Sequence, residues 1–208
     1  MRARKPFKAV VFLDIDGVIC TRRVHAAFKD SGTWWRPDPV ATRLVSRLSV
    51  ECGAAVVISS SWRKMDPRED IHGMLRKGGF RGFFHDDWAT PVLKGFRGDE
   101  VAAWLAAHPE VEKWVALDDD HDFHPGQHLV STHAEEGMMY AHYRQARAVL
   151  SADGDDPWDA VVADQMREAD DRFAAAVRAL AEAARLGQTF EARRLADVVE
   201  GMLAERGR

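Results

Sequence analysis

Four short apolar segments divide the first 150 residues of the chain, and each has the length of a buried strand. Residues 9–13 (AVVFL) and 54–58 (AAVVI) are continuous apolar runs, typical of strands covered on both faces in a parallel sheet. Residues 114–117 (WVAL) predict a third strand, and residues 129–130 (LV) predict a short fourth. The pattern therefore favours a sheet built mainly from parallel strands.

Between these strands, apolar residues recur at helical spacing. Three predicted helices occupy residues 39–53, 66–79 and 98–109, where proline, aspartate or glycine marks the ends. Their apolar faces consist of Val40, Leu44, Leu48, Ile71, Met74, Leu75, Val101, Trp104 and Leu105. Strands that alternate with helices indicate an α/β fold, with a doubly wound, Rossmann-like and mostly parallel sheet covered by helices on both faces.

The chain changes character near Ser151. Residues 152–157 (ADGDDP) form a polar, turn-rich stretch, and the residues after it are rich in alanine, arginine and glutamate. Helical spacing on either side of Gly187 predicts a C-terminal α-helical hairpin. We therefore expect two domains, 1–150 and 151–208. The second carries 13 acidic and 8 basic residues and is expected to pack on the first domain or on a second subunit of a homo-oligomer.

The overall composition limits the possible functions. A hydrophobic fraction of 46% and a charged fraction of 30% are ordinary for a globular protein. The net charge of -4 argues against nucleic-acid binding by bulk electrostatics, although it permits local basic patches. No apolar run approaches the roughly 18 residues of a membrane span, and Cys20 and Cys52 are too few for a disulfide framework. We expect a cytoplasmic protein with reduced thiols and no membrane contact.

Acidic residues follow two of the predicted strands. The first strand runs into Asp14 and Asp16, and the third runs into Asp118 and Asp119. Open parallel sheets bind ligands beyond the carboxyl ends of their strands. If these two strands are neighbours, Asp14, the Asp16 carbonyl and Asp118 or Asp119 form an all-oxygen pocket. Such a pocket suits Mg²⁺, which prefers hard oxygen ligands.

The second predicted strand runs into a polar segment, residues 59–63 (SSSWR). Serine hydroxyls, backbone amides and a guanidinium group can hold phosphate oxygens. Each segment alone is a weak signal. Their order along the chain, acidic, then hydroxyl-rich, then acidic, is more specific and indicates phosphate chemistry.

In this order the segments resemble the haloacid dehalogenase (HAD) superfamily of phosphotransferases, which use an aspartate nucleophile. Residues 14–17 (DIDG) are similar to its first motif, and residues 117–119 (LDD) are similar to its acidic fourth motif. A serine after the second strand and a lysine ahead of the third strand resemble the second and third motifs. Within the superfamily, the chain resembles a small branch that includes stand-alone phosphatases and phosphatase domains of nucleic-acid repair proteins. This closer resemblance lies in residues 58–63 (ISSSWR), 90–91 (TP), 97–101 (RGDEV) and 117–120 (LDDD). The resemblance covers roughly residues 8–147.

The resemblance implies a Mg²⁺-dependent phosphomonoester hydrolase that acts through an aspartyl-phosphate. Asp14 would attack phosphorus, and Asp16 would protonate the leaving oxygen and then activate water. Asp118 would bind the metal together with Asp14 and Asp16, and Asp119 would be a further ligand or would support the others.

The phosphate contacts have more than one candidate. Ser60 best matches the phosphate-binding serine of the superfamily, although Ser59 fits if the strand ends one residue earlier. Ser61 would add a further substrate contact. Arg63 would contact phosphate or an aspartate, or form a surface salt bridge.

The cationic partner of the nucleophile also has two candidates. Lys94 is favoured because it precedes Asp118 by 24 residues, enough for one helix and the strand that follows. It would act as a point charge between the nucleophile and the phosphoryl oxygens. Arg97 is its competitor, because it stands at the start of the same helix and could offer a bidentate fork.

Two further features lie near the expected site. The superfamily places a cap between Gly17 and Pro37, and about 20 residues suffice here for a minimal cap that leaves the site open to a bulky substrate. Trp34 or Trp35 would stack a base there, or both would pack the flap against the body. The cluster at residues 121–124 (HDFH) could suggest zinc, but loop histidines near an anionic site are commoner than a second metal centre.

The expected function is therefore Mg²⁺-dependent phosphomonoester hydrolysis through an aspartyl-phosphate, with a phosphorylated small molecule or a nucleic-acid end as the substrate. The sharper alternative is a phosphatase for nucleotides or for nucleic-acid ends that carry a 3'-phosphate. Two other hypotheses are a non-catalytic module that binds a phosphorylated ligand and an interaction protein that works through its acidic helices.

Overall fold

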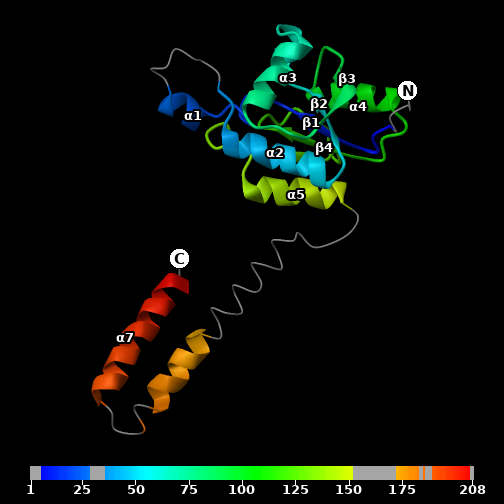
Figure 1. Ribbon diagram of the computed structural model, residues 1–208. Helices are drawn as coiled ribbons and strands as arrows, with labels where there is room; N and C mark the ends of the chain where they lie inside the picture. Colours follow the sequence, from blue (N-terminus) through cyan, green and yellow to red (C-terminus); the bar gives the residue numbers. More distant parts are fainter. Residues whose placement is uncertain (1–5, 29–35, 152–171, 183–184, 186–188, 207–208) are drawn as a thin grey trace. The chain divides into compact units, whose positions relative to one another are not determined.

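The computed structural model describes residues 6–28, 36–151, 172–182, 185 and 189–206 (Figure 1). The chain divides into two compact units, Met1–Ala152 and Asp153–Arg208. The first unit contains a β-sheet with helices on both faces, and the described residues of the second are helical.

Five parallel strands form one sheet in the order β3-β2-β1-β4-β5. Their bounds are β1 Ala9–Leu13, β2 Ala55–Ile58, β3 Phe83–Ala89, β4 Lys113–Asp118 and β5 Leu129–Ser131. The predicted α/β fold with a parallel sheet is thus confirmed. Four of the strands lie where apolar runs predicted them.

Strand β3 has no counterpart among the predicted strands. It lies at the edge of the sheet and, among the described residues, pairs with β2. Its middle residues His85, Asp86 and Asp87 interrupt any apolar pattern, and Asp86 and Asp87 are exposed. Edge strands tolerate charged residues, because only one side of the backbone must pair with a neighbour.

Helices pack on both faces of the sheet. One hydrophobic cluster joins β1, β2 and β4 to α2 (Pro39–Glu51), α3 (Arg68–Lys77) and α5 (Tyr140–Leu150). The second cluster joins the other faces of these strands to α4 (Arg97–Ala107), through the buried side chains of Val101 and Trp104. Helices α2 and α5 contact each other and run side by side in Figure 1.

The start of α2 shows how the local sequence sets an element boundary. The Asp38 side chain accepts hydrogen bonds from the backbone N–H groups of Val40 (2.8 Å) and Ala41 (3.2 Å), and Pro39 occupies the first turn. An N-cap carboxylate of this kind stabilises a helix by roughly 0.5–2 kcal/mol. The helix therefore begins where the proline pattern predicts.

Two short elements follow the first two sequence motifs. Helix α1 (Arg22–Ala27) comes after β1, and the 3-10 helix η2 (Ser61–Lys64) comes after β2. Helix α1 lies in the segment in which a minimal cap is predicted. Trp34 and Trp35, to which a stacking or packing role is assigned above, lie outside the described residues.

The sheet register places three loops at one edge. Beyond β1, the Asp14 N–H donates to the Leu117 carbonyl of β4 at 3.0 Å. The Ser59 N–H donates to the Leu13 carbonyl, also at 3.0 Å. The chain thus leaves β1, β2 and β4 at adjacent positions, which brings the acidic and serine-rich segments together.

The second unit contains the helical residues 172–182 and α7 (Thr189–Arg206). The two helices contact each other, which confirms the predicted C-terminal hairpin. The predicted linker at 152–157 and the predicted break at Gly187 lie outside the described residues. No helix in the described part of the chain combines the length and the apolar character needed to cross a membrane.

Candidate active site

Three carboxylates meet beyond the carboxyl ends of β1 and β4. Asp14, Asp118 and Asp119 each offer an oxygen, and these oxygens lie within 4.8 Å of one another. Asp14 is 5% exposed and Asp118 is 0% exposed. The predicted acidic pocket therefore forms, because β1 and β4 are neighbours in the sheet.

Gly17 lets Asp119 approach the loop after β1. Its backbone has φ +68°, a conformation that glycine adopts without steric cost. A Cβ atom at this position would lie 2.1 Å from Asp119 Cγ, closer than any side chain permits. The Asp119 carboxylate thus occupies the space that the missing side chain leaves, which explains the glycine of the DIDG segment.

Arg97 supplies the cation that contacts the nucleophile candidate. Its Nη1 donates to Asp14 Oδ1 at 3.0 Å and to the Ser59 carbonyl at 2.8 Å, and it lies 3.5 Å from Asp118 Oδ2. Lys94 is exposed and, within the described residues, makes no ion pair with a carboxylate. Of the two candidates for the cation beside the nucleophile, the structure therefore places Arg97, and not the favoured Lys94, in contact with Asp14.

Asp122 holds the start of α4 and was not singled out by the sequence. Its side-chain Oδ2 accepts from the Arg97 N–H at 3.1 Å, and its carbonyl accepts from the Gly98 N–H at 3.1 Å. A carboxylate at a helix N-terminus is also favoured by the helix dipole. Asp122 thereby fixes the turn from which the Arg97 side chain extends.

The acidic group carries more negative charge than its protein partners balance. Burial raises the pKa of Asp14 and of Asp118, and in Asp118 the charge of Asp14 adds to the effect, while Arg97 lowers both pKa values. Burial and the nearby charge of Asp120 raise the pKa of Asp119. Asp118 Oδ2 is buried and accepts no hydrogen bond in the described part of the chain. Oxygen donors, excess negative charge and a buried oxygen without a hydrogen bond all fit a divalent cation such as Mg²⁺.

The two buried serines after β2 have different surroundings. The Ser60 hydroxyl interacts with Asp14 and lowers the pKa of its carboxyl, and its oxygen accepts from the Trp62 N–H at 3.4 Å. Ser59 Oγ is buried and has no hydrogen-bond partner among the described residues. Ser61 is exposed and begins η2. Ser60 is thus the serine that contacts the nucleophile candidate.

Arg63 is a buried connector. Its side chain is 2% exposed, and all five N–H donors of the guanidinium are engaged. They reach Glu100 Oε2 (2.5 Å) and the carbonyls of Ser59, Ser60 (2.6 Å), Thr90 (2.9 Å) and Pro91 (3.3 Å). Glu100 was quoted within a motif but received no role from the sequence. Its other oxygen accepts from the Leu93 N–H at 3.0 Å.

Asp16 is exposed and lines a pocket together with Asp119, but its carboxylate does not belong to the group of three. Its Oδ2 accepts a hydrogen bond from the indole Nε1–H of Trp62 at 2.8 Å. This contact orients the second aspartate of the motif toward the outer side of the site. Trp62 is a residue that the sequence placed in a motif without assigning it a function.

A polar pocket of about 300 Å³ adjoins the acidic group. It is lined by Asp16, Gly17, Cys20, Thr21, Arg22, His25, Arg36, Asp119 and Ala134. Three of these residues, Arg22, His25 and Arg36, are basic. They face the same pocket as Asp16, the expected proton donor to a leaving group.

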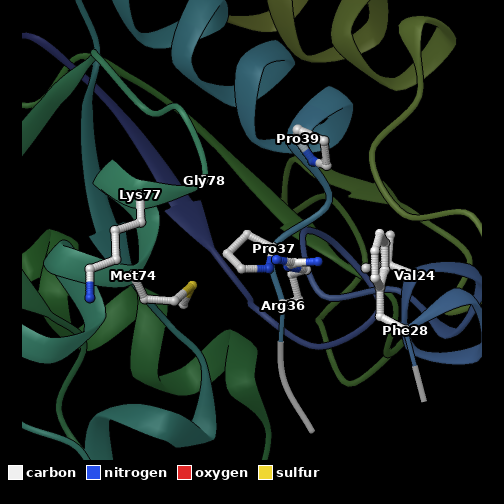
Figure 2. Close-up of a pocket in the computed structure, with 8 residues that line it drawn as sticks. All are labelled: Val24, Phe28, Arg36, Pro37, Pro39, Met74, Lys77 and Gly78. Atoms are coloured by element: carbon white, nitrogen blue, oxygen red, sulfur yellow. The ribbon is translucent and has the colours of Figure 1, made fainter. Parts of the chain in front are cut away.

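A second pocket, of about 420 Å³, lies beside the first and shares Arg36 with it. Figure 2 shows Val24 and Phe28 on one side of this pocket and Met74 and Lys77 on the other. None of the described residues that line it is acidic. It is therefore separate from the phosphate chemistry expected at Asp14.

The histidines after the acidic segment make pairwise contacts. His124 Nε2 lies 2.7 Å from Asp99 Oδ1, and His121 Nδ1 lies 3.4 Å from Ser131 Oγ. Within the described residues they do not join a group of three metal-binding side chains.

Comparison with known families agrees with this geometry. Residues 10–143, which is more than half of the chain, match the family described as HAD domain in Swiss Army Knife RNA repair proteins. Searches of curated proteins and of solved structures found no significant match. The match contains every strand of the sheet except the first residue of β1, and it includes both acidic segments. The chain belongs to the family of HAD domains found in Swiss Army Knife RNA repair proteins.

Proposed function

We propose that the protein is a Mg²⁺-dependent phosphomonoesterase that acts through an aspartyl-phosphate on Asp14. The observation that carries the proposal is the buried group of Asp14, Asp118 and Asp119, with Arg97 bound to Asp14. HAD domains are typically phosphohydrolases, so family membership supports the same reaction class.

In the first half-reaction, a carboxylate oxygen of Asp14 attacks phosphorus and the bond from phosphorus to the ester oxygen breaks. The leaving oxygen takes a proton from Asp16. Asp16 is suited to this task because it is exposed to the outer pocket and held by Trp62. Arg97 contacts Asp14 and would stabilise negative charge that develops on the transferring phosphoryl group.

In the second half-reaction, water attacks the phosphorus of the aspartyl-phosphate and gives a proton to Asp16. The bond from phosphorus to the Asp14 oxygen breaks, inorganic phosphate leaves and the carboxylate is restored. The covalent intermediate divides a slow hydrolysis into two easier steps.

Mg²⁺ would be held by Asp14, Asp118 and Asp119, with the Asp16 backbone carbonyl as a further oxygen. When bound, the ion would neutralise phosphoryl oxygens and the surrounding carboxylates. Asp118 Oδ2, which is buried and accepts no hydrogen bond within the described residues, is the oxygen best placed to gain from such a partner.

The surroundings refine the other roles. Arg97 takes the cationic position for which Lys94 was favoured, because Arg97 is the residue in contact with Asp14. Ser60 is the phosphate-binding serine, and Ser61 stays a candidate substrate contact. Arg63 has no donor left for phosphate, so we assign it to positioning the Ser59–Ser60 segment rather than to binding substrate.

We further propose that the substrate is the phosphorylated end of a nucleic acid. The family description names RNA repair proteins, and the pocket next to Asp16 is lined by Arg22, His25 and Arg36. Arginine pairs well with phosphate oxygens, so this pocket favours a leaving group that carries further phosphates. A small phosphate ester lacks those additional charges and gains less from the basic residues.

Three assignments from the sequence stay predictions. The division into a phosphatase domain of residues 1–150 and a helical extension of residues 151–208 is a proposal about independent folding. Homo-oligomerisation through the extension and a cytoplasmic location are likewise predictions.

Phosphate release tests the proposed function. Wild type and Asp14→Asn would be assayed with Mg²⁺ or with EDTA, on an aryl phosphate, nucleotides, sugar phosphates and 3'-phosphorylated oligonucleotides. We expect metal-dependent release that Asp14→Asn abolishes. Binding of the oligonucleotide with no release by wild type would instead support the non-catalytic module.

The substrate class has its own test. Arg36→Ala should lower kcat/KM for the oligonucleotide by more than it does for the aryl phosphate. Arg43, an exposed arginine on α2 that lines neither pocket, provides the matched control as Arg43→Ala. Equal losses on both substrates in Arg36→Ala would contradict a nucleic-acid end but leave the hydrolase mechanism standing.

A further inference from the structure

A second group of metal-binding side chains lies away from the acidic site. His85 comes from β3, His108 from the end of α4, and Glu110 from the turn that leads to β4. One ligand atom from each lies within 4.8 Å of the other two. Two imidazoles and a carboxylate are a different donor set from the all-oxygen group at Asp14.

The hydrogen bonds of His108 orient one ring nitrogen for a ligand. Its Nδ1 lies 2.8 Å from the Trp104 carbonyl. The backbone N–H of His108 donates to a different carbonyl, that of Leu105, so it does not compete for this contact. A carbonyl only accepts, so Nδ1 carries the proton and Nε2 has the free lone pair. An imidazole that donates one N–H to a backbone carbonyl is the usual arrangement of a histidine that binds metal through its other nitrogen.

His85 has a similar surrounding. Asp87 engages its Nδ1 from two sides, because the Asp87 N–H donates to Nδ1 at 3.1 Å and the Asp87 carbonyl lies 3.2 Å from it. Nε2 is therefore the ring nitrogen left for an ion, and binding there would shift the ring proton to Nδ1, toward that carbonyl. The residue is 8% exposed, so the ring position is set by packing. The Asp87 side chain also approaches the group, because its Oδ2 lies 3.5 Å from His108 Nε2. A fourth possible donor, this one an oxygen, is therefore close by.

Aromatic packing fixes both rings. The His108 ring stacks on Trp104 with centroids 3.7 Å apart, and the His85 ring meets the same indole edge-on at 4.9 Å. The two imidazoles are edge-on to each other at 5.0 Å. A ligand set held in this way loses little conformational freedom when an ion binds.

We propose that His85, His108 and Glu110 form a zinc site that joins the edge strand β3 to the turn between α4 and β4. Nitrogen and carboxylate donors suit Zn²⁺, whereas Mg²⁺ prefers oxygen alone. Helix α4 carries Arg97 in its first turn and His108 just beyond its last. Arg97 and His108 are eleven residues apart, so at 1.5 Å per helical residue the zinc site lies about 16 Å along the helix from the acidic site.

The expected consequence is structural. The ion would fasten the edge strand β3, which pairs with β2, to the far end of the helix that carries Arg97. A ligand that binds only the folded state raises Tm, by about 5 °C or more when its free concentration exceeds Kd roughly 100-fold.

The test uses the full chain after removal of metals by a chelator. Zn²⁺ would be titrated by calorimetry in excess Mg²⁺, and Tm would be measured with and without Zn²⁺. Co²⁺ would replace Zn²⁺ to detect the visible absorption of a four-coordinate site. The variant Asp118→Asn removes a ligand of the acidic site, so binding that persists in it lies elsewhere.

We expect one Zn²⁺ per chain in wild type and in Asp118→Asn, and loss of both the binding and the Tm increase in His108→Gln. Glu110→Gln is a second variant in case His108→Gln does not fold without metal. The exposed His133, as His133→Gln, is the matched control and should bind as wild type does. Absence of Zn²⁺ binding in wild type, or equal binding in Glu110→Gln and wild type, would overturn the proposal.

Discussion

Arg63 and Arg97 are both largely buried arginines near the acidic site, but their guanidinium groups differ in how many hydrogen bonds they make to the protein. Arg63 uses all five donors on protein oxygens, and its side chain is 2% exposed. Arg97 uses Nη1 alone within the described residues, and its side chain is 13% exposed. Beside Arg97, Asp118 Oδ2 has no hydrogen-bond partner. The Arg63 guanidinium has no donor left for a ligand, whereas Arg97 and Asp118 have unfilled bonding capacity.

This difference in hydrogen bonding suggests that Arg63 serves stability and Arg97 serves function. Buried polar groups normally find partners, and a group without one costs roughly 1–3 kcal/mol. At Asp118 and Arg97 this unfilled capacity coincides with a cluster of three carboxylates, and the two features together indicate the site of chemistry. The complete pairing of Arg63 indicates a role in holding that site together.

The largest effect is expected from Arg63→Ala. Removing the guanidinium leaves Glu100 charged and buried and frees four carbonyls, which should lower the free energy of unfolding by about 3–5 kcal/mol. Urea denaturation would measure the change. The double variant Arg63→Met with Glu100→Leu should recover part of the loss because no charge is left unpaired. A loss below about 1 kcal/mol in Arg63→Ala would show that Arg63 is not a structural connector.

Arg97→Ala should have the opposite profile. Loss of the group that contacts Asp14 is expected to lower kcat about 10²–10³-fold, by analogy with removal of one transition-state donor. The loss of stability should be smaller than in Arg63→Ala, because Asp14 and Asp118, whose pKa values are already raised by burial, can take up a proton once the cation is gone. Lys94→Ala is the matched control and should keep near-normal kcat. A larger loss of kcat in Lys94→Ala than in Arg97→Ala would reverse the assignment.

Gly17→Ala tests the approach of Asp119 to the loop after β1. The new Cβ would fall 2.1 Å from Asp119 Cγ and would also impose strain at φ +68°. Displacing one carboxylate should weaken apparent Mg²⁺ affinity about 10–100-fold, the range seen when a metal site loses supporting contacts. The Mg²⁺ dependence of phosphate release would measure the change. Gly53→Ala, at another positive-φ glycine with open space around it, controls for backbone strain. Similar effects of the two substitutions would contradict a specific role for the close approach.

The smallest effect is expected at His72, an unsatisfied group away from the acidic site. Burial lowers its pKa to about 4, the charges of Arg68 and Arg76 add to this, and its ring stacks on Phe84 at 3.6 Å. The unfolded chain binds a proton near pH 6.5 and the folded chain does not, so stability falls as pH drops from about 6.5 to about 4.

His72→Phe keeps a stacked ring and removes the proton. The loss of folding free energy between pH 7 and pH 4.5 should be smaller in this variant than in wild type. The difference should be on the order of 1 kcal/mol, because the ring is only partly buried. Thermal unfolding at pH 7 and at pH 4.5 would measure it. An unchanged difference between the two pH values would rule out His72 as its source.

The sequence predicts the centre of this sheet better than its edge. Strands β1, β2 and β4 are apolar runs because both of their faces are buried, and the acidic residues that follow mark the site. Strand β3 escapes the pattern because its partly exposed position tolerates Asp86 and Asp87. Helix α5 is not predicted from the apolar pattern, because its buried face includes the small residue Ala146.

The same physical limits apply to the site. The motif order predicts Asp14 and Asp118 because each is tied to the end of a strand, where the sheet fixes its position. The choice between Lys94 and Arg97 depends on where α4 begins, and a contact from Asp122 sets that boundary. The full engagement of Arg63 involves Glu100 and Thr90, which are 37 and 27 residues away. Spacing along the chain does not reveal such contacts.

The most direct test of the central claim is to identify the residue that carries the phosphoryl group. A single turnover with a phosphorylated oligonucleotide and Mg²⁺ would be quenched in acid, in wild type and in Asp16→Asn, and the peptides would be mapped by mass spectrometry. We predict the added mass of one phosphoryl group on the peptide that contains Asp14, with more of it in Asp16→Asn. Phosphate release without a modified protein, or modification of another residue, would contradict the account.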